Sequence, residues 1–123
     1  MRLPNIPVFL SALFLAVLFA AGVMAVEPGH ITPEEGKELI QQKSDLVIID
    51  CRNAAEYVTE HYPNALNIPV NELEARLSEV PAGKPVVVYC GLGMRSARAY
   101  DTLKDKRPDI TELYHINGAP IFD

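Results

Sequence analysis

The sequence predicts an α/β domain with a small, mainly parallel sheet flanked by helices, and two observations support this fold class. Residues 46–50 and 86–89 form apolar runs, which are typical of strands covered on both faces. Helix-start signals alternate with these runs, and strands that alternate with helices form parallel sheets. Ligands of such sheets bind beyond the carboxyl ends of the strands, where Asp50 and Cys90 both stand.

The first residues predict a segment that is separate from the folded domain. An early cation precedes an apolar run over 8–21, and small or aliphatic residues occupy the minus-three and minus-one positions of a signal-peptidase site. We therefore expect a signal peptide over 1–25, a single domain over 26–123, and a periplasmic or secreted protein. The alternative is a retained membrane anchor, because an uncharged run of about 20 residues can cross a bilayer.

Capping residues predict the helix starts, because short polar side chains accept hydrogen bonds from the N–H groups of the first turn. The expected N-caps are Thr32 with its capping-box partner Glu35, then Asn53, Asn71 and Ser96. The helices that follow are expected to end near residues 43, 58, 81 and 106. Short strands are expected at 30–31, 65–69 and 111–116.

The composition argues against nucleic acid as a partner. The chain carries 11 Lys and Arg residues against 16 Asp and Glu residues, a net charge of −5, and it shows no basic patch. Its two cysteines and three histidines show no metal-ligand spacing, so we expect no metal and no other cofactor.

Cys90 is the candidate nucleophile. It follows the second apolar run and should face the N-terminus of the next helix, where unpaired N–H groups favour an anion and lower the pKa of a thiol. Arg95 is expected to bind the donor anion, and Ser96 either caps the helix, which we favour, or donates to the sulfur. The expected anion-binding loop consists of Gly91, Leu92, Gly93, Met94, Arg95 and Ser96.

Two motifs resemble the rhodanese family. Residues 50–57 match D-x-R-x-x-x-E-[YF], and residues 90–96 match the active loop C-x-x-G-x-R-[ST]. The resemblance extends over about residues 31–118 and implies a rhodanese-like fold with its active loop between the strand at 86–90 and the helix at 96–106. It also implies a sulfurtransferase that moves a sulfane sulfur from a small donor such as thiosulfate to a thiol or cyanide, through a persulfide on Cys90.

The loop length separates two chemistries of this fold. Rhodanese-fold phosphatases and arsenate reductases resemble C-x5-R, whereas Cys90 and Arg95 are spaced C-x4-R. We therefore favour sulfur transfer and keep a phosphatase or arsenate reductase as one alternative. A sulfur-carrier or redox-sensing module that binds a partner protein without turnover is the other.

Cys51 departs from the family pattern, which usually has an aliphatic residue at this place. Asp-Cys-Arg at 50–52 resembles the cell-cycle phosphatases of this fold, and this likeness implies a reversible Cys51–Cys90 disulfide. A buried Cys51 that acts as a small hydrophobic residue is an equal alternative. An even cysteine count in an exported protein also permits a permanent disulfide, which would consume the nucleophile.

The remaining polar residues are expected to have architectural roles. Asp50 should order the active loop by accepting backbone N–H groups, and Arg52 should pair with Glu56 four residues later. His61 is expected to be a hydrogen-bonded structural residue.

The two remaining histidines and the end of the chain give no positive signal for a site. His30 and His115 show no partner pattern. The family usually continues into a final helix beyond the position of Asn117, so we expect a thinly covered sheet face and a possible protein partner or homo-oligomer. A membrane contact is expected only if the N-terminal segment is retained.

Overall fold

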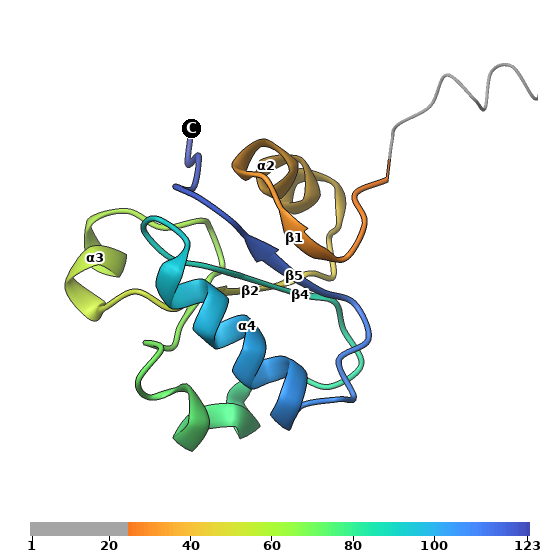
Figure 1. The fold of residues 1–123 in the computed structure, drawn as a ribbon. Coiled ribbons are helices and arrows are strands. Elements are labelled where there is room, and N and C mark those ends of the chain that lie inside the picture. Colours follow the sequence, from red (N-terminus) through yellow and green to blue (C-terminus); the bar gives the residue numbers. More distant parts are fainter. Residues whose placement is uncertain (1–24) are drawn as a thin grey trace, which may run out of the picture.

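The computed structural model describes residues 25–123, so the predicted signal peptide lies outside the described residues except for Ala25. Its sheet has five strands in the order β1-β5-β4-β2-β3, and every pair of neighbours is parallel (Figure 1). The strands are β1 (Gly29–Ile31), β2 (Val47–Asp50), β3 (Leu66–Asn67), β4 (Val86–Tyr89) and β5 (Leu113–Ile116). The predicted parallel α/β fold is confirmed.

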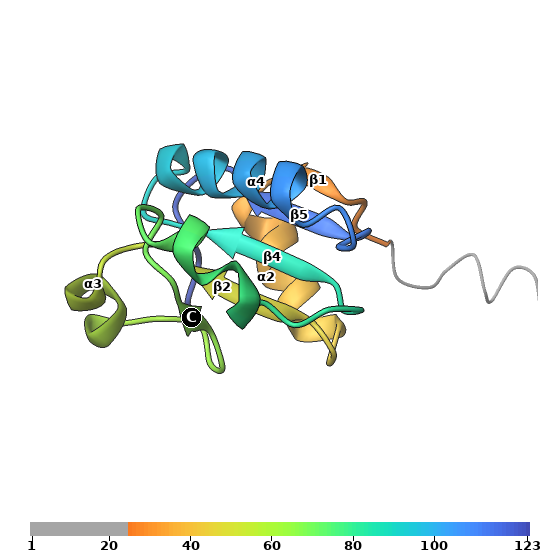
Figure 2. The ribbon, with the colours of Figure 1, turned by 90° about the horizontal axis from the view of Figure 1, so that it is seen from below.

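The helices are α2 (Pro33–Gln42), α3 (Ala54–Thr59), the 3-10 helix η1 (Leu73–Glu79) and α4 (Met94–Lys106). α2 and α4 lie on opposite faces of the sheet (Figure 2), and α3 has no buried residue. α4 and η1 pack with Val86 and Val88 on one face, and α2 packs with Val87 on the other. The residues of β4 are fully buried on both faces, which explains their continuous apolar character. No helix in the described part is long and apolar enough to cross a membrane.

Two of the four predicted N-caps are confirmed. Thr32 and Asn53 each accept a hydrogen bond from the N–H group three residues later, and each forms a complete capping box. Asn71 and Ser96 are not caps. Glu72 precedes η1 without a side-chain cap bond, and Gly93 begins α4 with a φ of 112°, so this helix starts before Ser96.

The register of the central strands brings the two cysteines together. Asp50 of β2 lies opposite Tyr89 of β4, and the Cys51 N–H donates to the Tyr89 carbonyl over 3.0 Å. Cys51 and Cys90 are the next residues along these two parallel strands. The prediction that their strands are neighbours is confirmed, and both cysteines are free thiols in this structure.

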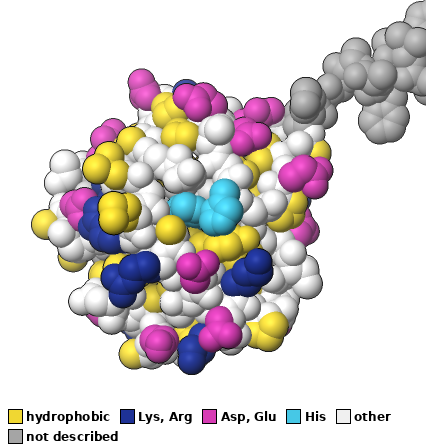
Figure 3. All heavy atoms as spheres, viewed as in Figure 1, with side chains coloured by type: hydrophobic (Ala, Val, Ile, Leu, Met, Phe, Trp, Pro, Cys, Tyr) yellow, Lys and Arg dark blue, Asp and Glu magenta, His cyan; other side chains and the backbone are white. Residues whose placement is uncertain are grey.

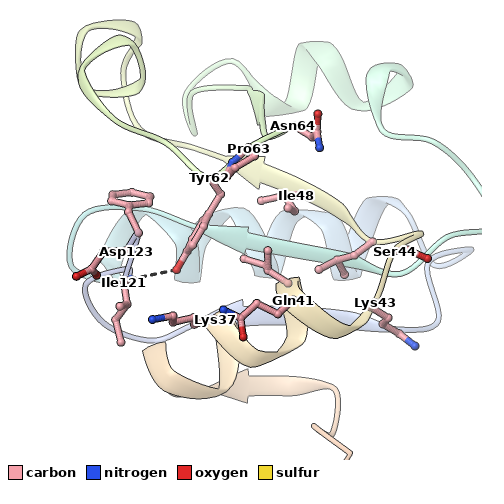
Figure 4. Close-up of a pocket in the computed structure, with 13 residues that line it drawn as sticks. Lys37, Gln41, Lys43, Ser44, Ile48, Tyr62, Pro63, Asn64, Ile121 and Asp123 are labelled. Atoms are coloured by element: carbon pink, nitrogen blue, oxygen red, sulfur yellow. Dashed lines mark hydrogen bonds between the residues drawn. The ribbon is translucent and has the colours of Figure 1, made fainter.

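A pocket of about 590 Å³ opens on the sheet face that carries α2, next to the last residues of the chain (Figure 4). Ile48, Tyr62 and Phe122 contribute to its wall, and the Ile121 N–H donates to the Tyr62 hydroxyl over 3.0 Å. None of the predicted site residues lines this pocket. The candidate site therefore lies elsewhere, at the carboxyl ends of the strands.

Candidate active site

The Cys90 sulfur is held by donors from the loop that follows it. The N–H groups of Gly93 and Ser96 donate to Sγ over 3.1 and 3.2 Å, and the Ser96 hydroxyl lies 3.2 Å from the same atom. Cys90 itself is 1% exposed. The first turn of α4 thus surrounds a buried sulfur with hydrogen-bond donors, which is the arrangement that a thiolate requires.

The two thiols have opposite acid–base properties. The hydrogen bond from Cys51, together with the donors on Ser96 and Gly93, lowers the pKa of Cys90 to about 4 against the effect of burial. The same hydrogen bond to Cys90, together with burial, raises the pKa of Cys51 well above its usual range. Cys90 is therefore the thiolate of the pair at neutral pH, and Cys51 keeps its proton.

Gly93 gives the loop its shape. Its φ of 112° lies in the left-handed region, and a Cβ atom there would stand 3.0 Å from the Gly118 nitrogen. The side chains of Leu92 and Met94 point outward and are 80% and 83% exposed. These two predicted loop residues therefore contribute backbone to the site and leave an apolar rim around it.

Ser96 differs from the prediction that favoured a cap. It is the third residue of α4, fully buried, and its hydroxyl lies 3.2 Å from both Cys90 Sγ and the Gly93 carbonyl oxygen. The hydroxyl is thus within hydrogen-bond distance of the sulfur, as the alternative role requires, and it can also donate to the Gly93 carbonyl oxygen.

Arg95 does not point freely into the loop. Its Nη1 and Nη2 atoms donate to the Glu56 carboxylate over 2.7 and 3.1 Å, and the guanidinium lies over Gly91. This ion pair lowers the pKa of Glu56 to about 2. The predicted Arg52–Glu56 pair is wrong, because the α3 capping box turns Glu56 toward the active loop. The expected free cation of the loop is thus compensated by a carboxylate.

Arg52 pairs with Asp50 beneath the site. Asp50 Oδ2 accepts from Arg52 Nη2 over 2.7 Å and from the Tyr89 hydroxyl over 2.8 Å, and Oδ1 accepts from the Arg52 N–H over 2.9 Å. The hydrogen bond to Asp50 raises the pKa of Arg52. Asp50 accepts a backbone N–H as predicted, but this N–H belongs to Arg52 and not to the active loop, and the other donors to its carboxylate are the Arg52 guanidinium and the Tyr89 hydroxyl. It fixes the strand ends from which both cysteines extend.

The contact between His30 and His115 was not predicted from the sequence. The Nδ1 atoms of the two rings lie 2.8 Å apart, and His115 Nε2 lies 2.9 Å from Ser96 Oγ. A signal was present, because a histidine in the otherwise buried strand β5 requires a hydrogen-bond partner. His61 behaves as predicted: its Nδ1 lies 2.7 Å from the Tyr57 carbonyl oxygen, and its ring stacks on Tyr57.

Comparison with known proteins identifies the family. The model of the rhodanese-like domain matches residues 32–119. The chain belongs to the rhodanese family. Within the described residues, this rhodanese domain has no group of three or more His, Cys, Asp or Glu side chains that could hold a metal ion.

The relatives of this rhodanese domain include full-length and partial matches. The uncharacterized protein YqhL of Bacillus subtilis is 27% identical over 116 residues, which cover 89% of this chain and 90% of YqhL. A sulfurtransferase of Allochromatium vinosum is 33% identical over 70 residues, or 57% of this chain and 65% of that protein. The solved structure of SSP1007 from Staphylococcus saprophyticus has a TM-score of 0.63 and 26% identity, with 76% of this chain and 89% of that chain covered.

Proposed function

We propose that this rhodanese domain is a sulfurtransferase that carries sulfur as a persulfide on Cys90. The Cys90 thiolate attacks the outer sulfur of thiosulfate or a similar donor, a new S–S bond forms, and sulfite leaves with the electron pair of the broken bond. A thiolate acceptor, or cyanide, then attacks the outer persulfide sulfur. Cys90 leaves as a thiolate, so no oxidant or reductant is required.

The observation that carries this proposal is the set of donors on the Cys90 sulfur. Hydrogen bonds from the N–H groups of Gly93 and Ser96 favour the thiolate at neutral pH, and the thiolate is the nucleophilic form. The N–H groups of Met94 and Arg95 belong to the first turn of α4 and have no partner within the helix. They are the donors available to the outer sulfur of a persulfide anion. The sulfurtransferase of Allochromatium vinosum supports the same chemistry by likeness.

One feature favours sulfur transfer over the phosphatase or arsenate reductase alternative. The loop from Cys90 to Arg95 is one residue shorter than the C-x5-R pattern. The persulfide anion that sulfur transfer requires carries one charge, and backbone N–H groups can bind it.

The test is a thiosulfate:cyanide assay on the wild-type protein and on Cys90→Ser, with Arg98→Ala as a control on the exposed surface of α4. We expect sulfur transfer to be lost in Cys90→Ser and retained in Arg98→Ala. Undiminished transfer in Cys90→Ser would overturn the proposal. Turnover of an aryl phosphate or arsenate without turnover of thiosulfate would favour the alternative.

Cys51 supports a second function as a redox partner of Cys90. Its thiol is adjacent to Cys90 and buried at 1% exposure, and its Sγ lies 3.3 Å from the Tyr89 carbonyl oxygen. Attack of the Cys51 sulfur on Sγ of the Cys90 persulfide would form a disulfide and release hydrogen sulfide. Such a disulfide would protect the nucleophile in the periplasmic or secreted location that we propose from residues 1–25.

A further inference from the structure

Four polar groups form an unbroken line from the surface to the Cys90 sulfur. His30 Nδ1 lies 2.8 Å from His115 Nδ1, His115 Nε2 lies 2.9 Å from Ser96 Oγ, and Ser96 Oγ lies 3.2 Å from Cys90 Sγ. His30 is exposed, whereas His115, Ser96 and Cys90 are at most 2% exposed. The line therefore joins a buried nucleophile to a side chain that water can reach.

The parallel sheet builds this line through its register. His30 of β1 lies opposite His115 of β5, so their side chains emerge on the same face. His115 in turn lies opposite Val88 of β4, and Cys90 follows Val88 by two residues on the face that α4 covers. The Ser96 side chain, on α4, lies between His115 and Cys90. Histidine side chains reach the surface near the centre of this face (Figure 3).

In the thiolate state, the contacts allow one continuous set of donors from the surface to the sulfur. When His115 carries its hydrogen on Nε2, which also lies 3.2 Å from the Gly93 carbonyl oxygen, its Nδ1 accepts from His30 Nδ1–H. His115 Nε2–H then donates to Ser96 Oγ. The Ser96 hydroxyl lies 3.2 Å from both the Gly93 carbonyl oxygen and Cys90 Sγ, and in this state it donates to the anionic sulfur.

We propose that His30, His115 and Ser96 form a proton relay that exchanges the Cys90 proton with solvent and holds the sulfur as a thiolate. In the thiol state, the direction of every hydrogen bond in the line is reversed. Cys90 Sγ–H donates to Ser96 Oγ, and the Ser96 hydroxyl donates to His115 Nε2. His115 Nδ1–H then donates to His30 Nδ1, and His30 Nε2–H faces water. When His30 Nε2 releases its proton, each of the other three protons moves one step outward. One proton leaves to solvent and the thiolate remains.

The surroundings of His115 suit a neutral relay group. His30 on β1, Tyr100 and Asp101 on α4, and Cys90 after β4 are the titratable groups that face it. Burial, opposed by the hydrogen bond to Gly93, lowers the pKa of His115. A neutral imidazole can donate at one nitrogen and accept at the other, as the relay requires.

The first experiment titrates the ultraviolet absorbance of the Cys90 thiolate in the full chain. We expect His115→Leu to raise the pKa of Cys90 by about one unit, because the Ser96 proton then turns to Gly93. His30→Ala removes an exposed side chain and leaves the core intact. We expect it to raise the pKa of Cys90 by a smaller amount, which free imidazole restores. His61→Ala is the matched control, since its ring lies outside the relay, and it should titrate as the wild type does.

The second experiment reads the tautomer directly from the nitrogen-15 shifts of the histidine rings. We expect His115 to carry its hydrogen on Nε2 at neutral pH and to lose this preference in His30→Ala. A thiolate titration that is unchanged in both His115→Leu and His30→Ala would overturn the relay, as would a His115 protonated on Nδ1. The relay uses the nucleophile of the proposed function, but neither measurement involves sulfur transfer, so the two proposals fail separately.

Discussion

At the scale of single residues, the charge at the mouth of the site is set by Glu56. The Arg95–Glu56 pair is short at 2.7 Å, yet both side chains are more than a third exposed. Solvent screens such a pair, and its strength is at most about 1 kcal/mol. Under the proposed function, a dianionic donor such as thiosulfate would displace the carboxylate, so that Glu56 would compete with the donor for Arg95.

We expect Glu56→Gln to lower the KM for thiosulfate by up to about fivefold, because Arg95 becomes a free cation. The amide side chain of this variant still completes the α3 capping box. Glu60→Gln is the matched control, since it removes an exposed carboxylate from the end of the same helix. Steady-state kinetics with varied thiosulfate measure the effect. A KM that is equal in Glu56→Gln and Glu60→Gln would show that Arg95 does not bind the donor.

We expect mild oxidation of the wild-type protein to reduce its intact mass by about 2 Da, through a Cys51–Cys90 disulfide. A reducing agent should reverse this loss. Cys51→Ala should show no such loss, because Cys90 then has no adjacent thiol. If the oxidised wild-type protein keeps two free thiols, Cys51 serves only as a small buried side chain.

At the scale of the elements, the active loop depends on the segment that follows β5. Gly93 lies close to Asn117 and Gly118, so the start of α4 packs against the segment that follows β5. This contact positions the two N–H groups that bind the Cys90 sulfur.

We expect Gly93→Ala to destabilise the domain by about 1–3 kcal/mol and to reduce sulfur transfer, because the new Cβ meets Gly118 at 3.0 Å. Gly83→Ala is the control: its φ of 74° is also positive, but a Cβ there meets nothing within 4 Å. Chemical denaturation and the transfer assay separate the effects. Equal loss of activity in both variants would contradict this role of the loop.

Patterns of adjacent residues predict the helices and strands well, but they do not predict which side chains pair across the fold. The Thr32 and Asn53 capping boxes and the buried run of β4 are contained in adjacent residues, so the sequence alone reveals them. The partners of Arg95 and His115 are more than fifteen residues away and depend on sheet order. The role of Ser96 differs from the expected one because a glycine with positive φ begins the helix without a side-chain cap.

At the scale of the whole molecule, the site makes stability depend on pH. The pKa of Cys90 is about 4 in the folded protein, whereas an unfolded thiol has a pKa of about 8.5. Between these values the unfolded chain binds one proton that the folded protein does not, so stability rises with pH. The lowered pKa of His115 acts in the same direction below about pH 6.5.

We expect the free energy of unfolding to increase by about 1 kcal/mol per pH unit between about pH 5 and pH 8. Cys90→Ala should flatten most of this dependence, since it removes the group whose pKa differs most between the folded and unfolded protein. Urea denaturation at several pH values measures both slopes. A dependence that is equally steep in Cys90→Ala would mean that the folded protein does not stabilise the thiolate.

If Cys90 carries sulfur, the intact mass of the protein changes after mixing with thiosulfate. We predict an adduct of about 32 Da on the wild-type protein, which an added thiol removes, and no adduct on Cys90→Ser. A wild-type protein that gains no sulfur, or a Cys90→Ser protein that gains it equally, would show that Cys90 is not the sulfur carrier.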